Sequence, residues 1–543
     1  MTRASSRHLI DTVGAVRVIL RAGAVPGIRL DHFVKLAAAV RRFGPFAGVV
    51  YAHVGNGVDR VALVDDLGSL TYADLEAQSN ALVRGWRADG LTENSVIGMI
   101  CRNHRGFVLT LLAAGKLGAK IVLLNTGFAA PQLAEVAARE GVDGIVFDTE
   151  FSDVAGPLPS TTRKYVAWVD DDVPLPYPSV ADTISGQATY AVPTHEHPGG
   201  ITVLTSGTTG LPKGAPRDRV SPLAGALLLD RVPFRAEQSL LAAAPLFHGT
   251  GLGVFVTCLV LRNTIVMTRT FDPHECVRLL ADHKCDSLVV VPTMLQRIIN
   301  LGRNTIARHD TSNLKIILAA GSALTPDLCG KTHQYLGPVL YNMYGSTEVA
   351  VATVATPQDL LDAPGTVGYP PVTARVRLYG EDGVAVTEPD VPGRIFAANG
   401  SSFNGYTDGR DKERIDGLLS TGDVGHFDSK GRLFVDGRDD DMIVSGGENV
   451  YPIEIENMLA DRDDVLDVCV VGVPDADFGQ RLRAFIVAEP SSPRDPAVIK
   501  EHVRANLARY KVPRDVIFID ELPRNATGKV LRSALAQMET GAH

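Results

Sequence analysis

A Gly- and Thr-rich segment at residues 204–214 carries the clearest chemical signal in the sequence. It reads Leu-Thr-Ser-Gly-Thr-Thr-Gly-Leu-Pro-Lys-Gly. Glycines let the backbone approach an anion closely, hydroxyls donate hydrogen bonds to phosphate oxygens, and a lysine adds a point charge. The segment is not the GxxxxGK[ST] loop, because Gly214 follows Lys213 where a hydroxyl residue would bind magnesium. It predicts a polyphosphate cradle whose binding residues are Thr205, Ser206, Gly207, Thr208, Thr209, Gly210 and Lys213.

A second motif, Tyr344-Gly345-Ser346-Thr347-Glu348, combines an aromatic face, hydroxyls and a carboxylate. A nucleotide–magnesium complex needs these groups: a stacking surface, a phosphate donor and a hard oxygen ligand. The two motifs, with others in the same order between residues 201 and 532, resemble the adenylate-forming superfamily of acyl-CoA synthetases, luciferases and adenylation domains. The chain looks most like bacterial fatty acyl-CoA synthetases. The resemblance implies that Tyr344 and Gly345 border adenine, Thr347 contacts the α-phosphate and Glu348 holds Mg²⁺.

Three shorter motifs extend this resemblance around the nucleotide. Gly321-Ser322-Ala323 resembles the loop beside adenine, where small residues leave room for the ring. Thr421-Gly422-Asp423 resembles the ribose site, in which the carboxylate accepts hydrogen bonds from both hydroxyls of the sugar. Arg438 resembles the arginine that helps to hold the same ribose.

The segment Pro523-Arg524-Asn525-Ala526-Thr527-Gly528-Lys529 resembles the C-terminal loop that carries the adenylation lysine. A carboxylate that attacks an anionic phosphate is repelled by it, and an ammonium between the two anions stabilises the transition state. Lys529 is therefore the foremost catalytic candidate. The family more often has proline at the position of Ala526, a departure that would loosen the loop and leaves the lysine intact.

Two motifs after residue 439 resemble the parts that the family uses for its second half-reaction. Asp440 matches the hinge about which the small domain turns between adenylation and thioester formation, and a solvated linker can absorb such torsion changes. Ser445, Gly446 and Gly447 resemble the segment beside the pantetheine tunnel of CoA ligases. Glycines suit a narrow passage because they carry no side chain.

The stretch Ala244-Pro245-Leu246-Phe247-His248 resembles the border of the acyl pocket, with Phe247 beside it and His248 as a catalytic candidate near the carboxylate. Gly249, Gly251 and Gly253 are expected to leave space. Leu252 stands where some long-chain ligases place a bulky aromatic gate. These residues favour an open hydrophobic channel over a compact aryl pocket.

Other catalytic and metal-binding schemes have little support in the sequence. It contains no GxSxG, HExxH or strand-linked GxGxxG motif. Six cysteines without a CxxC pair indicate reduced, buried thiols. His274, Cys276, His283 and Cys285 fall within one amphipathic helical pattern, so they are not expected to bind a metal.

The elements that must position these motifs alternate between strands and helices. Apolar runs at 95–101, 120–124, 144–148 and 201–204 read as strands, with helical patterns at 107–117 and 131–139 between them, which implies parallel sheets. Short strands with Gly and Asp turns follow from about residue 400. We expect an α/β fold with a large N-terminal domain (1–439) of βαβ sheets plus a small β-rich subdomain, and a small, mobile α+β domain (440–543).

Charge and length restrict the remaining alternatives. The 543 residues carry a net charge of −9, which argues against nucleic-acid binding. Residues 1–44 carry eight basic and two acidic side chains in two amphipathic patterns split by Pro26-Gly27. We expect helices packed on the main domain, with peripheral contact to anionic lipid as the alternative. The uncharged run Leu240–Leu261 holds one proline and three glycines, so it is not expected to span a membrane, and the protein is expected to be cytoplasmic.

The sequence therefore predicts an ATP- and Mg²⁺-dependent ligase that joins a medium- to long-chain fatty acid to coenzyme A through an acyl-adenylate. The alternatives are a fatty acyl-AMP ligase, a ligase for aryl or other carboxylic acids, and a nucleotide-binding scaffold without catalysis. Intact Lys529, Glu348 and Asp423 argue against the scaffold.

Overall fold

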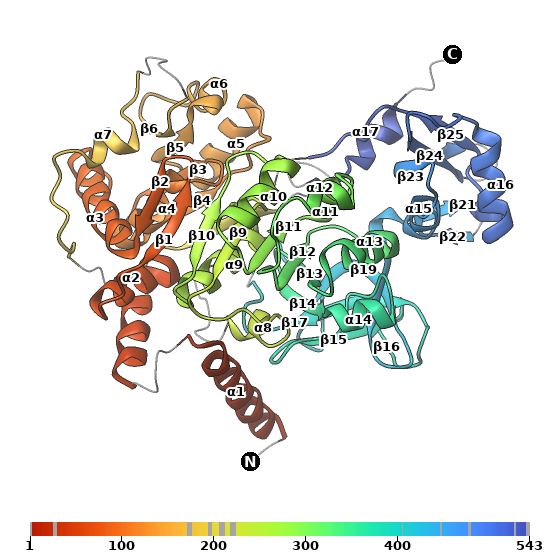
Figure 1. Ribbon diagram of the computed structural model, residues 1–543, viewed down its shortest axis with the longest axis horizontal. Helices are drawn as coiled ribbons and strands as arrows, with labels where there is room; N and C mark the ends of the chain where they lie inside the picture. The colour runs from red at the N-terminus through yellow and green to blue at the C-terminus, as the bar shows by residue number, and fades with distance from the viewer. Residues whose placement is uncertain are drawn as a thin grey trace.

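Two mainly parallel sheets form the centre of the large N-terminal domain (Figure 1). The computed structural model describes residues 3–24, 30–170, 176–193, 198–205, 212–217, 224–403, 405–445, 448–475, 479–525 and 528–538. The first sheet has the order β14-β13-β12-β11-β9-β10-β1-β2 and is parallel except at its two edge pairs. Its strands are β1 (Val61–Asp65), β2 (Gly68–Thr71), β9 (Ser239–Ala242), β10 (Thr264–Met267), β11 (Ser287–Val290), β12 (Ile316–Ala320), β13 (Leu340–Ser346) and β14 (Ala350–Ala355).

The second sheet has the order β6-β5-β3-β4-β7-β8 and is parallel except for the β7–β8 pair. Its strands are β3 (Val96–Ile100), β4 (Lys120–Leu123), β5 (Gly144–Asp148), β6 (Arg163–Trp168), β7 (Ile201–Thr205) and β8 (Lys213–Pro216). The predicted strands of this region are confirmed. The polar stretch between residues 153 and 198 contains more regular structure than its composition suggested, because β6 adds to the sheet edge beside β5.

Helices fill the space between the two sheets and cover their outer faces. The main buried core joins both sheets through α2 (Leu30–Gly55), α3 (Tyr72–Ala88), α4 (Arg105–Leu117) and α9 (Gly249–Val260). A second core lies under α10 (Pro273–Asp282), α11 (Pro292–Ile299) and α13 (Pro326–Leu336), and a third under α5 (Ala130–Glu140) and α6 (Ser152–Ala155). The layers therefore alternate between helices and sheets, as parallel sheets buried on both faces require.

The remaining helices of this domain are short or terminal. They are α1 (Arg3–Ala22), η1 (Thr149–Phe151), α7 (Val180–Ile184), α8 (Ala226–Leu229), α12 (Arg303–Ile306) and α14 (Pro357–Asp362).

An antiparallel sheet follows the parallel ones and forms the predicted β-rich subdomain. Its order is β16-β15-β17-β19-β18, with β20 paired to β19. The strands are β15 (Arg375–Tyr379), β16 (Ala385–Val386), β17 (Gly393–Ala398), β18 (Arg414–Ile415), β19 (Leu418–Phe427) and β20 (Leu433–Arg438).

The small C-terminal domain is built on one sheet with helices on both faces, and Figure 1 shows it to one side of the large domain. The turn η2 (Asp439–Asp441) leads into β21 (Ile443–Ser445), β22 (Glu448–Val450), β23 (Val465–Asp475), β24 (Gly479–Ala488) and β25 (Asp515–Phe518). Its helices are α15 (Pro452–Ala460), α16 (Pro496–Asn506), η3 (Arg509–Lys511) and α17 (Arg532–Gln537). The α/β fold class is confirmed, whereas the boundary after residue 439 and the mobility of the small domain stay predictions.

The two N-terminal helices pack on the large domain, as expected. Ala15 and Ala22 of α1 are buried, and Ala22 accepts a backbone hydrogen bond from Ala236 at 2.9 Å. Helix α2 bends sharply at Gly44, whose φ of +77° is accessible to glycine, and Pro45 begins its second half. Among the described helices, none combines the length and the apolar character needed to cross a bilayer.

Candidate active site

A cavity of about 2850 Å³ opens between the two domains and extends into the large one. It is bordered by residues from the ends of β12 and β13, the antiparallel sheet, α9 and the C-terminal loop. It brings together most of the predicted site residues: Lys213, His248, Gly249, Gly251, Leu252, Gly321, Ser322, Ala323, Tyr344, Gly345, Thr347, Glu348, Asp423, Arg438 and Lys529.

The predicted ribose site forms across two antiparallel strands. Asp423 on β19 lies directly opposite Arg438 on β20, and Arg438 Nη1 is 3.7 Å from Asp423 Oδ1. The Tyr344 hydroxyl donates to Asp423 Oδ2 at 2.5 Å. Burial raises the pKa of Asp423, while the Tyr344 hydrogen bond and the charges of Arg438 and Lys529 oppose the rise. These partners favour an ionised carboxylate that can accept from a sugar.

The turn after Tyr344 needs a residue without a side chain. A Cβ on Gly345 would lie 1.8 Å from the carbonyl oxygen of Ala350, so only glycine fits where β13 and β14 pair irregularly. Ala350 itself has a positive φ of 66°, a strained conformation for a non-glycine residue. The strained backbone of Ala350 and its close approach to Gly345 therefore flank Thr347 and Glu348.

Glu348 is held by residues that the sequence did not single out. The Tyr406 hydroxyl donates to Glu348 Oε1 at 2.5 Å, and Lys213 Nζ lies 5.0 Å from the centre of the Tyr406 ring. Arg217 donates to the backbone carbonyls of Thr347 and Ser401, and burial lowers its pKa to about 10. Tyr406 stands outside every motif, whereas Arg217 follows the 204–214 segment by three residues and was not recognised as part of it.

Part of the predicted phosphate cradle lies outside the described residues. This applies to Ser206, Gly207, Thr208, Thr209 and Gly210, and to the side chain of Thr205. The two ends of the segment are described: Thr205 ends β7 and pairs with Lys213, which begins β8. A Cβ on Gly214 would lie 2.6 Å from Thr407 Oγ1, so this glycine serves close packing.

The C-terminal loop brings Lys529 into the cavity that holds the predicted nucleotide-binding residues. Its charge is among those that act on Asp423, and both residues line the cavity. Asn525 Oδ1 accepts from the Lys529 backbone N–H at 3.0 Å, and Asn525 N–H donates to the Lys529 carbonyl at 2.9 Å. A Cβ on Gly528 would lie 2.5 Å from Thr293 Oγ1 at the start of α11, so this loop touches the large domain. The loop therefore places Lys529 in the same cavity as Asp423.

The residues on either side of the predicted hinge form ion pairs, one with the large domain and one with the small domain. Asp439 Oδ2 is 3.3 Å from Arg394 Nε on β17, and Asp441 Oδ2 is 3.5 Å from Arg532 Nε on α17. Asp440 lies between them in η2; its side chain is outside the described residues. In the predicted CoA segment, the backbone of Ser445 ends β21, while Gly446 and Gly447 are outside the described residues.

The residues predicted to border the acid agree only in part with their positions in the structure. A Cβ on Gly249 would meet nothing within 4 Å, and the same holds for Gly253, so both face open space. Gly251 leaves no space, because its Cβ would lie 2.4 Å from the Pro245 carbonyl oxygen. Phe247 is 4% exposed and packs in the main core, with its ring centre 4.3 Å from that of His248. The expectations that Gly251 leaves space and that Phe247 borders the pocket are corrected by this packing.

His248 stands where the cavity meets the start of α9. Its Nε2 is buried and has no hydrogen-bond partner among the described residues, and burial lowers its pKa to about 4. The ring is therefore neutral near pH 7. Asn103 fixes the segment that precedes His248. Its side-chain amide donates to the carbonyls of Ala242 and Ala244, and its Oδ1 accepts from Leu246 N–H at 2.9 Å.

We expect this buried histidine to make stability fall as the pH is lowered. In the unfolded chain this histidine binds a proton with a pKa of about 6.5, whereas in the folded chain it binds one only near pH 4. Stability is therefore lost as the pH falls from about 6.5 to about 4. From pH 7 to pH 5 the loss is on the order of 2 kcal/mol. Urea unfolding at pH 7 and pH 5 measures this loss as a difference in the free energy of unfolding. The difference should be smaller in His248→Leu than in the parent protein. An equal difference in both would contradict a neutral His248.

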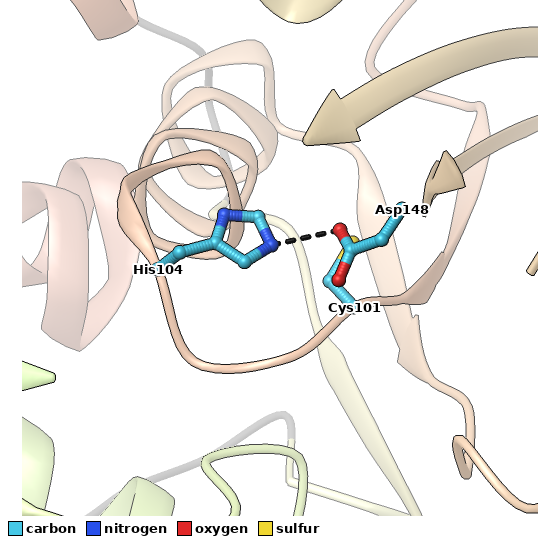
Figure 2. A group of neighbouring side chains, drawn as sticks. All are labelled: Cys101, His104 and Asp148. Atoms are coloured by element: carbon cyan, nitrogen blue, oxygen red, sulfur yellow. Dashed lines mark hydrogen bonds and ion pairs between the residues drawn. The ribbon is translucent and has the colours of Figure 1, made fainter. Parts of the chain in front are cut away.

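A buried group of Cys101, His104 and Asp148 has the residue types of a metal site (Figure 2). However, its ligand atoms are already engaged. His104 Nε2 lies 2.7 Å from Asp148 Oδ1, and His104 Nδ1 accepts from Gly106 N–H at the start of α4. Asp148 Oδ2 accepts from Arg102 N–H at 2.8 Å. Burial and the Asp148 charge raise the pKa of Cys101, which keeps it a thiol. The group ties α4 to β5.

The fold and the cavity define an adenylate-forming enzyme. The chain belongs to the AMP-binding enzyme family: the family model matches residues 51–407, and the model of the AMP-binding enzyme C-terminal domain matches residues 454–529. Among solved structures, ATP-bound MatB from Rhodopseudomonas palustris has a TM-score of 0.77 and 26% identity, covering 90% of this chain and 99% of that one.

The curated relatives are ligases for several acids. An indoleacetate–CoA ligase from Aromatoleum aromaticum is 30% identical, over 90% of this chain and 96% of the relative. A feruloyl-CoA synthase from Amycolatopsis sp. is 31% identical, over 86% and 93%. A fatty acid–[acyl-carrier-protein] ligase, ScoC, from Streptomyces coeruleorubidus is 28% identical, over 86% and 91%.

Proposed function

We propose that this protein is an AMP-forming acid–CoA ligase whose acid is apolar and carries an aromatic ring. The single observation that supports it best is the meeting of Lys529, the Asp423 ribose group and His248 at one cavity. Relatives that act on indoleacetate and ferulate favour the aromatic acid over the fatty acid predicted from the sequence. A fatty acid is the second candidate, because Gly249 and Gly253 leave open space and ScoC acts on fatty acids.

In the first half-reaction, the acid carboxylate would attack the α-phosphate of ATP and pyrophosphate would leave. Asp423 and Arg438 would hold the ribose, Tyr344 would border adenine with its hydroxyl on Asp423, and the Lys529 ammonium would reduce the repulsion between the two anions. The neutral ring of His248 would border the carboxylate without adding a charge. The cradle at 205–214, which includes Lys213, would hold the phosphates that leave.

The Glu348 carboxylate fits the Mg²⁺ that accompanies ATP. It is 7% exposed, lines the cavity and supplies a hard oxygen, and Tyr406 orients it through one oxygen. When bound, Mg²⁺ would neutralise phosphate charge.

In the second half-reaction, the small domain (440–543) would turn about Asp440 and withdraw Lys529. The CoA thiol would then attack the acyl carbon, the thioester bond would form and AMP would leave. Ser445, Gly446 and Gly447 would border the pantetheine arm in that arrangement.

AMP release with and without CoA tests this proposal across indoleacetate, ferulate, benzoate, acetate, dodecanoate and hexadecanoate. We expect CoA-dependent release that is greatest with an aromatic acid. A maximum with a fatty acid would establish the second candidate. Pyrophosphate release without free AMP, with or without CoA, would indicate a fatty acyl-AMP ligase, because AMP then stays in the acyl-adenylate. The absence of release with all acids would overturn the ligase proposal.

We also propose a peripheral contact between α1 and anionic lipid. Val13, Val16 and Leu20 are 61%, 41% and 48% exposed on one face of α1, and Arg17 and Arg21 are exposed beside them. Figure 1 shows α1 at the edge of the molecule.

Phosphatidylglycerol vesicles should sediment the protein, and phosphatidylcholine vesicles should not. Leu20→Glu should weaken this binding severalfold through loss of apolar insertion. The exposed Val384, far along the chain, gives the control Val384→Glu. Equal sedimentation of both variants with the parent protein would contradict the contact.

A further inference from the structure

The part of the cavity beyond His248 is long and follows a single helix. Residues at both ends of α9, from Gly249 to Val260, line it. At 1.5 Å per residue, twelve helical residues span about 18 Å. A space of this length exceeds what one aromatic ring next to the carboxylate would fill.

The two N-terminal helices contribute a further wall of the same cavity. Leu36 and Val40, one turn apart on α2, line the cavity together with Ile19 of α1. Phe46 and Val49 continue the wall beyond the bend, and Phe46 stacks on Phe255 of α9 with ring centres 6.1 Å apart. All five residues precede residue 51, where the match to the family begins.

Specific contacts hold these helices against the large domain. Arg262 donates to the backbone carbonyls of Gly23 and Ala24, at 2.9 and 3.2 Å. A Cβ on Gly48 would lie 2.4 Å from the Ala39 carbonyl oxygen, so the two halves of α2 pack closely across the bend. The wall is therefore an integral part of the domain.

We propose that α1 and α2 form a subsite for an extended apolar tail, and that Leu36 and Val40 set the length of the acid that the enzyme accepts. This inference rests on the proposed function. The acid would carry an alkyl or arylalkyl tail running along α9, with its carboxylate beside His248. Burial of each further methylene in this space would favour longer acids until the tail meets the α2 wall.

The test compares Val40→Trp with the matched control Val34→Trp. Val34 lies on the same half of α2 and is 58% exposed. Pyrophosphate exchange is measured with fatty acids and ω-phenylalkanoates of increasing length. We expect Val40→Trp to lower activity with the longest acids about tenfold or more relative to the shortest, because the indole fills the tail space. Val34→Trp should keep the profile of the parent protein.

Binding of fluorescent cis-parinaric acid, measured without ATP, separates this inference from the proposed function. Weaker binding in Val40→Trp and in Leu36→Trp, with unchanged binding in Val34→Trp, would support the tail subsite even if no acid were adenylated. Unchanged length profiles and unchanged parinaric acid binding in both wall variants would overturn it. Leu36→Trp also serves if Val40→Trp does not fold.

Discussion

Replacement of Lys529 by alanine is expected to lower ATP–pyrophosphate exchange by about 10²–10³-fold, the loss typical of removing one electrostatic contact to a transition state. Thioester formation from supplied acyl-adenylate should stay close to that of the parent protein. The reason is that the two anions meet only in the first half-reaction. In the second half-reaction the phosphate is already joined to the acyl group and the attacking thiol comes from CoA.

The structure offers a matched control for this substitution. Lys500 lies in the same domain, and its Nζ donates to the Arg514 carbonyl away from the cavity lining. Lys500→Ala removes the same charge and should leave both half-reactions intact. Equal losses of both half-reactions in Lys529→Ala would show that the residue acts on something other than adenylation.

Asp440→Pro is expected to have the opposite effect: adenylation continues, and thioester formation falls by about 10²-fold. Proline fixes φ near −65°, which suits the turn η2 and resists the torsion change that a rotation needs. The ion pairs of Asp439 with Arg394 and of Asp441 with Arg532 fasten the two neighbours to different domains. We therefore expect residue 440 to be the pivot of the reorientation.

Single-turnover measurements of the two half-reactions check this expectation. Asp440→Ala is the control, because it removes the same carboxylate and leaves the backbone torsions free. It should support both reactions. Normal CoA turnover in Asp440→Pro would place the pivot elsewhere. Loss of both reactions would mean that the proline also disturbs Asp439, whose helical conformation it disfavours.

Much of the architecture could be predicted because local patterns decided it. The strand Gly144–Asp148 has the bounds that its apolar run indicated, and the helix predicted at 107–117 is α4, which begins at Arg105. The ribose pair could be expected from motifs, and the register of β19 and β20 explains why residues 15 positions apart lie opposite each other. The predicted roles of the site residues themselves stay predictions.

The errors have a common physical origin: they depend on how backbone and side chains pack in three dimensions, which a residue pattern does not show. Gly251 was expected to leave space, but the Pro245 carbonyl occupies that place. Tyr406 and Arg217 contact the Thr347-Glu348 segment from distant parts of the chain, so no motif that contains Thr347 and Glu348 could indicate them. The amphipathic pattern before residue 44 indicated an apolar face, but it could not indicate that Leu36 and Val40 line the cavity.

The residues of α1 and α2 that line the cavity lie in a different part of the sequence from the predicted nucleotide-binding motifs. Residues before position 51 border the far end of the cavity, while the motifs for phosphate, ribose and magnesium lie beyond position 200. We therefore expect substitutions in the first fifty residues to alter which acids fit while the predicted nucleotide-binding residues keep their places. We expect that grafting this N-terminal segment onto another member of the family would change the length of the acid accepted and leave the rate of adenylation of short acids unchanged.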